Sequence, residues 1–521
     1  MAGVVRMPEK VFSKIKSNIL PQWTACFVAA MVTGLIAHLY KLTGWLPNWD
    51  SLVFRYDPQR MIGLGRWFLN VVCAPGSFYD LPFLNGLISI VSHALGSVVM
   101  CRILNVKSKV TAALIGGVVA SFPAVTSVLM YSYVADGYGI AFLLSCLAAY
   151  YMTRNNPRYF VAALLVTFSA GIYQAYITVT VMLVIMYLVE ELGHRKKPTK
   201  EIFVKTLKIF FSGLAGIVLY FVILKILLAF FSKSLLNYQG LNDAASLSSV
   251  DIKASLYCIK ETFLSYFFHS TKGLSVFSVL NGIIFIFTLC FYIAYGVKKC
   301  LFASFVKVII LCGLGFCMIL GSSCLAFLNA SIDYHNLMLM GYCVFYVFFI
   351  IIYERGSGFG DKFQCTKKWV VLVLSGILIF NQVVIANVSY HKAQIAYEKS
   401  YGVVVRIADR IEQLPDYSDA DKILVIGSLE GSEAYSVELP PDITGITDGY
   451  IVRADDETVG QSVLCSTLND YCGMNYSFLA GKEKTAMMQK KEIKDIAVWP
   501  SAGCVRIVDD IVVIKLSTEG E

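Results

Sequence analysis

The chain has 521 residues, of which 57% are hydrophobic and only 15% are charged, and its mean hydropathy is +0.65. Soluble domains carry about a quarter of charged residues, so this composition excludes a water-soluble globular protein. The net charge of +8 is unevenly spread: residues 1–388 hold 31 Lys and Arg against 14 Asp and Glu, and residues 389–521 hold 13 against 22. The resulting nets of +17 and −9 argue against a nucleic-acid binder and indicate a basic, apolar body followed by an acidic, water-soluble tail.

Apolar windows near 20 residues long, enough to cross about 30 Å of hydrocarbon, recur from Gln22 onward. Eleven spans are predicted, at about 22–41, 83–102, 110–132, 138–153, 160–175, 177–192, 208–230, 275–296, 305–326, 338–353 and 368–388. No small-residue cleavage motif follows the first of them, so we expect it to stay as an anchor.

Lys and Arg gather in alternate loops. The N-terminal segment and the loops on its side of the predicted membrane hold 22 of them, whereas the opposite loops hold 8. Short cytoplasmic loops retain Lys and Arg, so we expect a cytoplasmic N-terminus and, with an odd number of spans, an external tail. Two long connections, about 41–82 and 232–273, then lie on the outer side, where the architecture has room for a functional cavity.

The tail predicts a small extracytoplasmic α/β domain over 389–521. A helical pattern covers about 390–414, and the apolar run 423–427 is typical of a buried strand. The segments 504–507 and 511–515 predict a hairpin. A disulfide between Cys465 and Cys472 is an open alternative on an oxidising side.

The first outer loop combines the residue types that group transfer from a phosphate requires. Asp50 follows the first span, and its carboxylate can accept a proton from an attacking hydroxyl. Arg60 and Arg66 can hold a phosphate through forked, permanently charged donors, and Trp49 and Trp67 can pack against sugar rings. This set suits displacement of a lipid-linked phosphate from a sugar. The alternative is that the tryptophans belong to an interfacial belt and the charges solvate a loop.

An acidic residue after the first span, followed by Gly65-Arg66-Trp67, resembles the Gtr-type O-antigen glucosyltransferases of bacteria. The resemblance extends to Phe122-Pro123, to the short hairpin at Gln174 and to the closing strands at 505–515. It implies a GT-C-like polytopic helical membrane protein with about 11 transmembrane helices over 1–388. It also implies a polyprenyl-phosphate sugar donor, a surface glycan or O-antigen acceptor, and a place in the bacterial cytoplasmic (inner) membrane.

Carried over by this resemblance, Asp50 is the catalytic base and Arg66 contacts the donor phosphate. Two positions depart from the family pattern. Ser51 stands where many members have a second acidic residue, and His335 stands near where many have an arginine. If His335 replaces that group, phosphate binding there depends on pH; the alternative is an ordinary interfacial side chain.

Three further polar residues are candidates for binding the sugar or the acceptor. Asp136 follows a tyrosine-rich turn that contains Tyr131 and Tyr133. It could orient the acceptor, assist a metal or act as a second base, or be a solvated turn residue. Gln174 could bond a sugar hydroxyl or pack a helical hairpin, and Tyr238 lies where an outer loop could close over a donor or simply turn.

The resulting hypothesis is an inverting glycosyltransferase that moves a hexose, with glucose favoured, from a polyprenyl-phosphate to a surface glycan on the outer face of the membrane. Its partners are this donor, the acceptor and membrane lipids, and no nucleic acid. No cofactor is assigned, no metal-ligand spacing is present, and a divalent metal stays an open alternative. The competing hypotheses are a flippase or transporter of lipid-linked saccharides, and a polymerase or ligase of surface polysaccharide.

Overall fold

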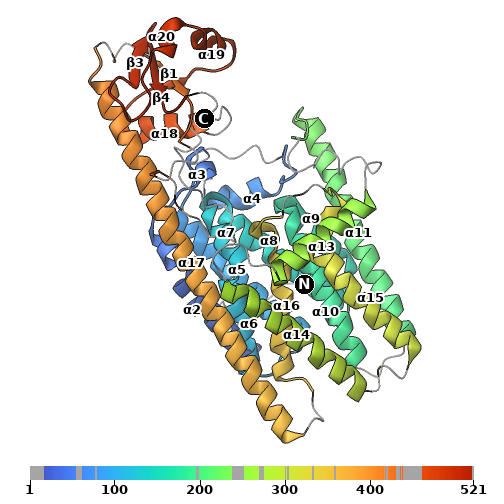
Figure 1. The fold of residues 1–521 in the computed structure, drawn as a ribbon. Coiled ribbons are helices and arrows are strands. Elements are labelled where there is room, and N and C mark those ends of the chain that lie inside the picture. Colours follow the sequence, from blue (N-terminus) through green and yellow to red (C-terminus); the bar gives the residue numbers. More distant parts are fainter. Residues whose placement is uncertain are drawn as a thin grey trace, which may run out of the picture.

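The computed structural model describes most of the chain, in ranges separated by gaps. These ranges are 17–53, 62–76, 79–194, 199–236, 251–268, 275–299, 301, 304–330, 332, 334–356, 360–415, 417, 420–429, 434–435, 437 and 460–518. A bundle of helices makes up the body, and a small α/β domain lies at one end of it, at the tip of the long helix α17 (Figure 1). We call this end of the bundle the domain end.

Within those ranges, nine helical segments are long and apolar enough to cross a membrane. They are α2 (Pro21–Thr43), α5 (Pro82–Ile103), α6 (Lys109–Ser121) with α7 (Pro123–Met130), η2 (Ser132–Val134) with α8 (Ala135–Thr153), η3 (Gln174–Tyr176) with α10 (Ile177–His194), α11 (Thr199–Phe230), α14 (Ser275–Lys298), α15 (Phe305–Ser322) and α17 (Asp361–Glu412). The other two predicted spans correspond to shorter apolar helices. They are α9 (Tyr159–Ile172) and the continuous run of η8 (Met340–Tyr342), α16 (Cys343–Ile350) and η9 (Ile351–Tyr353). The protein is therefore a polytopic helical membrane protein, as the hydropathy predicts.

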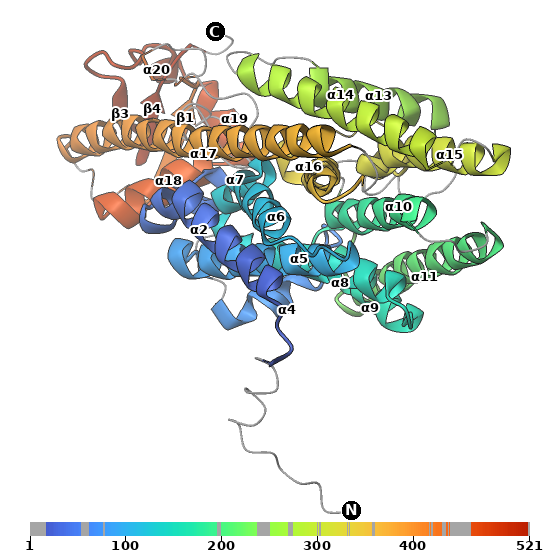
Figure 2. The ribbon, with the colours of Figure 1, turned by 90° about the horizontal axis from the view of Figure 1, so that it is seen from below.

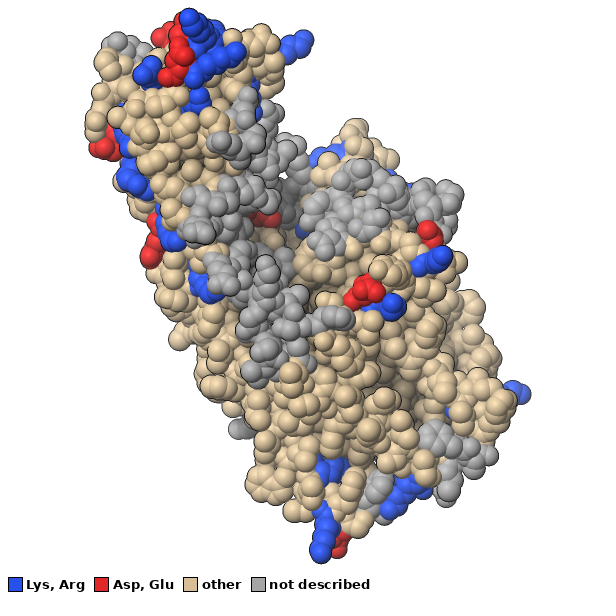
Figure 3. Space-filling model, in the orientation of Figure 1, with Lys and Arg blue, Asp and Glu red and all other residues tan. Residues whose placement is uncertain are grey.

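The tightest part of the bundle is formed by α2, α5, α6, α8 and α9, which pack on one another. At Gly116 the backbones of α6 and α2 approach so closely that a Cβ would lie 2.3 Å from the carbonyl oxygen of Cys26. Outer helices such as α11 and α15 leave large apolar side chains exposed, including Phe210 and Phe305. Charged side chains are sparse along the middle of the visible face (Figure 3), as expected of a surface in contact with lipid.

One long connection contains a helix that the sequence analysis did not predict. The segment predicted as a loop at about 232–273 contains α13 (Ile252–Phe268), which packs on α14 and α15. Its apolar residues recur at helical spacing, with Ser255, Ile259, Phe263 and Phe267 buried along one side. Charged residues at other positions keep the mean hydropathy of α13 below that of a span. Hydropathy therefore does not predict this helix.

The predicted boundary between body and tail falls inside a single helix. α17 runs for 52 residues, from Asp361 to Glu412, and joins the predicted span at 368–388 to the predicted helix at 390–414. No proline interrupts this sequence, so nothing stops the helix where its composition turns polar. In the body α17 contacts α2, α6 and α16 (Figure 2), and its last turns enter the core of the C-terminal domain.

The C-terminal domain contains a four-stranded sheet of order β2-β1-β4-β3. The strands are β1 (Lys422–Ile426), β2 (Ser477–Phe478), β3 (Val505–Val508) and β4 (Ile511–Lys515). β1 is parallel to β2 and β4, and β3 pairs antiparallel with β4. Asp509 and Asp510 turn the β3–β4 hairpin with φ of 49° and 57°, the left-handed pair that two-residue hairpin turns require. The predicted strand at 423–427 and the predicted hairpin are confirmed.

Helices cover both faces of this sheet. Alternate strand residues such as Ile423 and Val512 face α17 and α18 (Gly460–Cys472), whereas Leu424 and Val513 face α19 (Gly481–Met488) and α20 (Lys491–Lys494). This alternation follows from the twofold period of a strand. The two faces of the sheet have separate hydrophobic cores. A substitution in one core therefore does not touch the side chains of the other.

The alternative of a disulfide between Cys465 and Cys472 is wrong. Both cysteines are free thiols, and both lie on α18, seven residues apart. At 1.5 Å of rise per residue their Cα atoms are about 10 Å apart, whereas a disulfide needs less than about 7 Å.

Candidate active site

Asp50 lies on a short helix at the domain end, α3 (Trp49–Val53). The amide of Ser51 donates to Oδ1 of Asn48 at 2.8 Å, and the amide of Leu52 donates to the carbonyl oxygen of Asn48 at 3.1 Å. The Asn48 side chain thus satisfies an amide of the first turn that has no partner within the helix, and the Asn48 carbonyl accepts the first helical hydrogen bond. The ammonium of Lys41, at the end of α2, donates to the carbonyl oxygen of Leu46 at 2.6 Å and so holds the segment between α2 and α3.

The carboxyl group of Asp50 is in a low-dielectric environment opposite a cation. Burial raises the pKa of Asp50, and the nearby Arg66 guanidinium lowers it. The phenol of Tyr133, from η2, lies within the electrostatic reach of both groups. Asp50, Arg66 and Tyr133 therefore lie within electrostatic range of one another, although they come from three separate segments. Raised pKa values bring a carboxyl closer to the range in which it can act as a base near neutral pH.

Arg66 is held in position by two tyrosines. Its Nη1 donates to the hydroxyl of Tyr138 at 3.0 Å, and its guanidinium carbon lies 4.9 Å from the ring centroid of Tyr173. The two rings are stacked, with centroids 4.6 Å apart and planes 18° apart. Cation–π contacts of this kind favour a guanidinium over an ammonium, so the aromatic pair orients Arg66 before any substrate arrives.

The turn that carries Arg66 is also held by Gln174 and Tyr220. Gln174 Nε2 donates to the carbonyl oxygen of Leu64 at 3.2 Å and to the hydroxyl of Tyr220 at 2.9 Å, and this hydroxyl donates to the carbonyl oxygen of Gly65 at 3.0 Å. Gly65 has a φ of +73°, which favours glycine at this position. Gln174 therefore binds the backbone of the Arg66 loop, and its predicted role toward a sugar hydroxyl stays a prediction.

Trp67 packs inside the protein. Its side chain is 9% exposed and lies in a cluster with Phe68, Phe168 and Tyr220. The contact with α9 is close, because a Cβ on Gly171 would lie 2.8 Å from the indole. Beside it, the amide of Phe68 donates to the carbonyl oxygen of Gly171 at 2.8 Å. In this arrangement Trp67 anchors the loop, and its predicted contact with a sugar stays a prediction.

Asp136 is buried in the first turn of α8, at 4% exposure. Its Oδ1 accepts hydrogen bonds from the amide of Gly137 at 2.8 Å and from the thiol of Cys73 at 3.4 Å. Cys73 ends the short helix α4 (Leu69–Cys73), and burial together with the adjacent carboxylate raises the pKa of this thiol, so it stays protonated as a donor. The interpretation of Asp136 as a solvated turn residue is wrong, because the side chain joins α8 to α4.

The remaining candidates differ in how much of them the structure describes. His335 is half-buried just before η7 (Asn336–Met338), which packs against α7, the helix that leads into the tyrosine-rich turn. Trp49 begins α3, and its side chain is outside the described part of the chain; Arg60 and Tyr238 lie wholly outside it. Among the described residues, no group of three or more His, Cys, Asp and Glu side chains could hold a metal ion.

Sequence reasoning missed two residues that shape the site, Tyr138 and Tyr220. Both lie inside apolar helices, where a single tyrosine gives no signal distinct from an interfacial or core residue. Their partners are 72 and 155 positions away in the sequence. The only sequence signal that could have pointed to Tyr138 and Tyr220 is the presence of a tyrosine in a span close to a charged loop.

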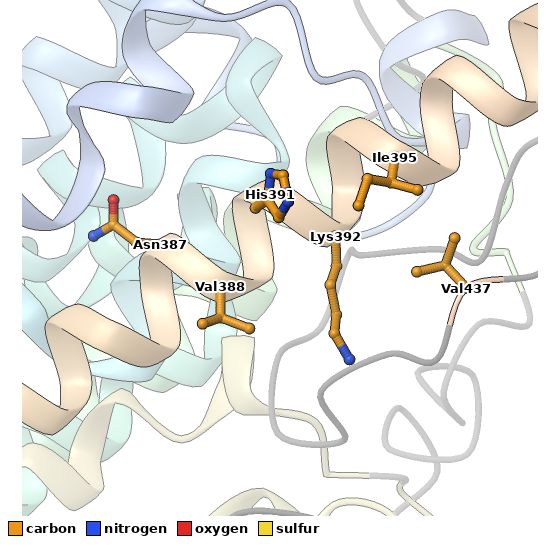
Figure 4. A pocket seen from close by; sticks show the side chains of 6 residues that line it. All are labelled: Asn387, Val388, His391, Lys392, Ile395 and Val437. Atoms are coloured by element: carbon orange, nitrogen blue, oxygen red, sulfur yellow. The ribbon is translucent and has the colours of Figure 1, made fainter.

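A cavity of about 500 Å³ opens beside α17 where this helix leaves the body (Figure 4). Asn387, Val388, His391, Lys392, Ile395 and Val437 line it. Its walls are mainly apolar, and Asn387 is engaged with α2, donating to the carbonyl oxygens of Ile36 and Ala37 at 3.3 Å each. Figure 3 also shows a hollow between the C-terminal domain and the bundle, with a small acidic patch in it.

Comparison with known proteins identifies a matching protein family. The model of the family described as Glucosyl transferase GtrII matches residues 39–353, about three fifths of the chain. This region contains Asp50, Arg66, Asp136, Gln174 and His335, and it ends before α17 and the C-terminal domain. No curated protein and no solved structure matches the chain.

Proposed function

Because the chain belongs to the GtrII family of glucosyl transferases, we propose that it transfers a hexose, with glucose favoured, from a polyprenyl-phosphate donor to a surface glycan. The electrostatic coupling of the half-buried Asp50 carboxyl to the guanidinium of Arg66 carries this proposal. A base and a phosphate-binding cation side by side are what displacement of a sugar from a phosphate needs. The family match by itself supports glycosyl transfer and nothing finer. The donor, the acceptor and the residue roles are our proposals.

The reaction is a single displacement. Asp50 takes the proton of an acceptor hydroxyl, whose oxygen forms a bond to the anomeric carbon of the sugar. The bond from that carbon to the phosphate oxygen breaks, and its electron pair leaves with the polyprenyl phosphate. Arg66 stabilises the negative charge of this leaving group, which needs no strong general acid. Attack from the face opposite the phosphate inverts the anomeric configuration.

The proposed location is the bacterial cytoplasmic membrane, with the domain end facing outward. Nucleotide sugars are cytoplasmic, so a site on the outer face requires a donor that is already lipid-linked and has crossed the membrane. The loop charges favour this orientation. The isoprenoid chain would remain in the bilayer, while its phosphate meets Arg66 at the end of the bundle.

The test is transfer by the purified protein in lipid nanodiscs, with radiolabelled polyprenyl-phosphate glucose or nucleotide-linked glucose as donor and extracted surface polysaccharide as acceptor. We expect label in the polysaccharide from the lipid-linked donor only. Transfer from the nucleotide sugar would overturn the proposed donor. Transfer of preassembled oligosaccharide units would favour a polymerase or ligase, and movement of lipid-linked sugar across liposomes without a new glycosidic bond would favour a flippase.

A further inference from the structure

We propose that the C-terminal domain sets the position of Asp50, with Leu52 as the positioning residue, so that body and domain form one catalytic unit. This inference rests on the proposed role of Asp50. It concerns a part of the chain beyond the region that the family model matches, because residues 39–353 end before this domain.

The segment that carries Asp50 is buried at two points, in two different cores. Leu46 is 3% exposed and belongs to the core of the helical bundle. Leu52 is 2% exposed and belongs to the core of the C-terminal domain, with Val403 and Ile407 of α17 and Leu464 of α18. α3 packs directly on α18. The chain thus enters the domain core only two residues after Asp50.

Helical geometry places Asp50 and Leu52 on opposite sides of α3. Successive residues of a helix are about 100° apart, so positions i and i+2 are separated by about 200°. Leu52 faces the domain, and Asp50 interacts with Arg66 and Tyr133 of the body. α3 therefore lies between the two parts, and the position of the domain determines how far Asp50 reaches toward Arg66.

A hydrogen bond next to α3 reinforces this connection. Trp45 Nε1 donates to the hydroxyl of Tyr471 on α18 at 2.8 Å. The ring of Tyr471 packs edge-on against Tyr401 of α17, with centroids 6.0 Å apart. The segment between α2 and α3 is thereby held at two adjacent residues, Leu46 by Lys41 of the body and Trp45 by Tyr471 of the domain.

The five-residue helix α3 cannot hold its own position. Isolated helices shorter than about 12 residues are marginal in water, so tertiary packing must fix α3. A displacement of about 1 Å at a reacting group can cost about 100-fold in rate. Loss of the Leu52 contact should therefore lower the rate of the catalytic step. If the domain served only to bind the acceptor, the same change would instead raise the acceptor KM.

The test compares Leu52→Ala with Leu479→Ala in the full-length protein. Leu479 is 2% exposed and lies in the other core of the same domain, against Leu424 and Met487. Both variants lose the same atoms from a domain core, but only Leu52 lies on α3. We expect kcat to fall about 10- to 100-fold in Leu52→Ala, with donor and acceptor KM within threefold of wild type. Leu479→Ala should have the wild-type kcat per folded molecule. Leu52→Met, which keeps a large apolar side chain on α3, should have most of the wild-type kcat.

Two readouts separate positioning from a general loss of stability. In Leu52→Ala the acid limb of the pH profile of kcat should move away from its wild-type position, because the pKa of Asp50 depends on both its burial and its approach to Arg66, and a displaced α3 changes both; in Leu479→Ala the limb should not move. Hydrogen exchange at residues 44–53 should rise in Leu52→Ala and stay at the wild-type rate in Leu479→Ala. If Leu52→Ala does not fold, Tyr471→Phe removes one bond and should lower kcat severalfold with raised exchange in the same segment.

Equal effects of Leu52→Ala and Leu479→Ala on kcat, or a wild-type exchange rate at residues 44–53 in Leu52→Ala, would overturn the proposal. The exchange measurement needs no substrate. If wild-type protein transfers no sugar from the lipid-linked donor, the proposed function fails while exchange still tests whether the domain holds α3.

Discussion

The hydroxyl of Tyr138 accepts a hydrogen bond from Nη1 of Arg66 at 3.0 Å, and this bond ties the first loop to helix α8. Tyr173 provides a second support for the same guanidinium through its ring face. A guanidinium has five N–H donors in a fixed plane, so orienting it through one of them also directs the others. Such preorganisation is effective where negative charge develops on a leaving phosphate.

Arg66 should therefore be more sensitive to substitution than its charge alone suggests. We expect Arg66→Ala to reduce transfer by about 100- to 1,000-fold, the usual loss for a donor that stabilises developing charge. Arg66→Lys should recover only part of this, because an ammonium cannot reproduce the planar fork. The measurement is kcat/KM with the lipid-linked donor. Arg102→Lys, near Trp23 and Tyr150, is the matched control and should have wild-type activity; equal activity of Arg66→Lys and wild type would contradict the role.

Gln174 and Tyr220 should act together on the donor. Gln174→Leu frees the backbone at Leu64, and Tyr220→Phe frees the carbonyl of Gly65, so each should raise the donor KM about three- to tenfold through a less ordered Arg66 loop. Because the two side chains share one network, the double variant should be less impaired than the product of the single effects. Multiplicative effects in a double-mutant cycle would show that they act separately.

Asp136 should contribute to stability rather than to proton transfer. Asp136→Ala removes the acceptor of two hydrogen bonds and should lower the free energy of unfolding by about 1–3 kcal/mol, seen as a lower thermal midpoint. Asp136→Asn retains an oxygen acceptor and should keep most of its activity per folded molecule. A normally folded Asp136→Asn protein with a loss of transfer above 100-fold would instead identify Asp136 as a second base.

Much of the fold is predictable because its signals are local. Hydropathy found the spans, and alternation with a short acidic turn found the hairpin that ends at Lys515. The continuity of α17 was missed because composition changes sharply near Tyr390 while the backbone has no reason to break. α13 was missed because its charged residues keep its mean hydropathy below that of a span.

The site was predictable only in part. Asp50 and Arg66 were predicted from charge next to a span, and the structure places them within electrostatic range of each other; their roles stay predictions. The contacts that hold them come from Tyr138 and Leu52, and these depend on partners that are distant in sequence. Local pattern cannot show which of two cores a leucine enters, nor that Trp67 turns inward rather than outward.

The pH dependence of transfer should report the environment of Asp50. A base works when deprotonated, so kcat/KM should rise with pH through the pKa of Asp50, which burial places above its ordinary value and Arg66 pulls down. In Arg66→Gln that opposing influence is gone, so the acid limb of the residual activity should move to higher pH. An unmoved limb in Arg66→Gln, with Arg102→Gln as control, would show that another group titrates.

The most direct measurement is glycosidic bond formation by purified Asp50→Asn protein with the lipid-linked donor. We expect a loss of about 100- to 10,000-fold, the contribution of a general base. We also expect an unchanged or higher thermal midpoint at neutral pH. The raised pKa of Asp50 means that its contribution to stability is full below the unfolded-state pKa and is lost as pH rises through the folded-state pKa. The amide avoids this cost. A folded Asp50→Asn protein whose rate stays within tenfold of wild type would show that Asp50 is not the catalytic base.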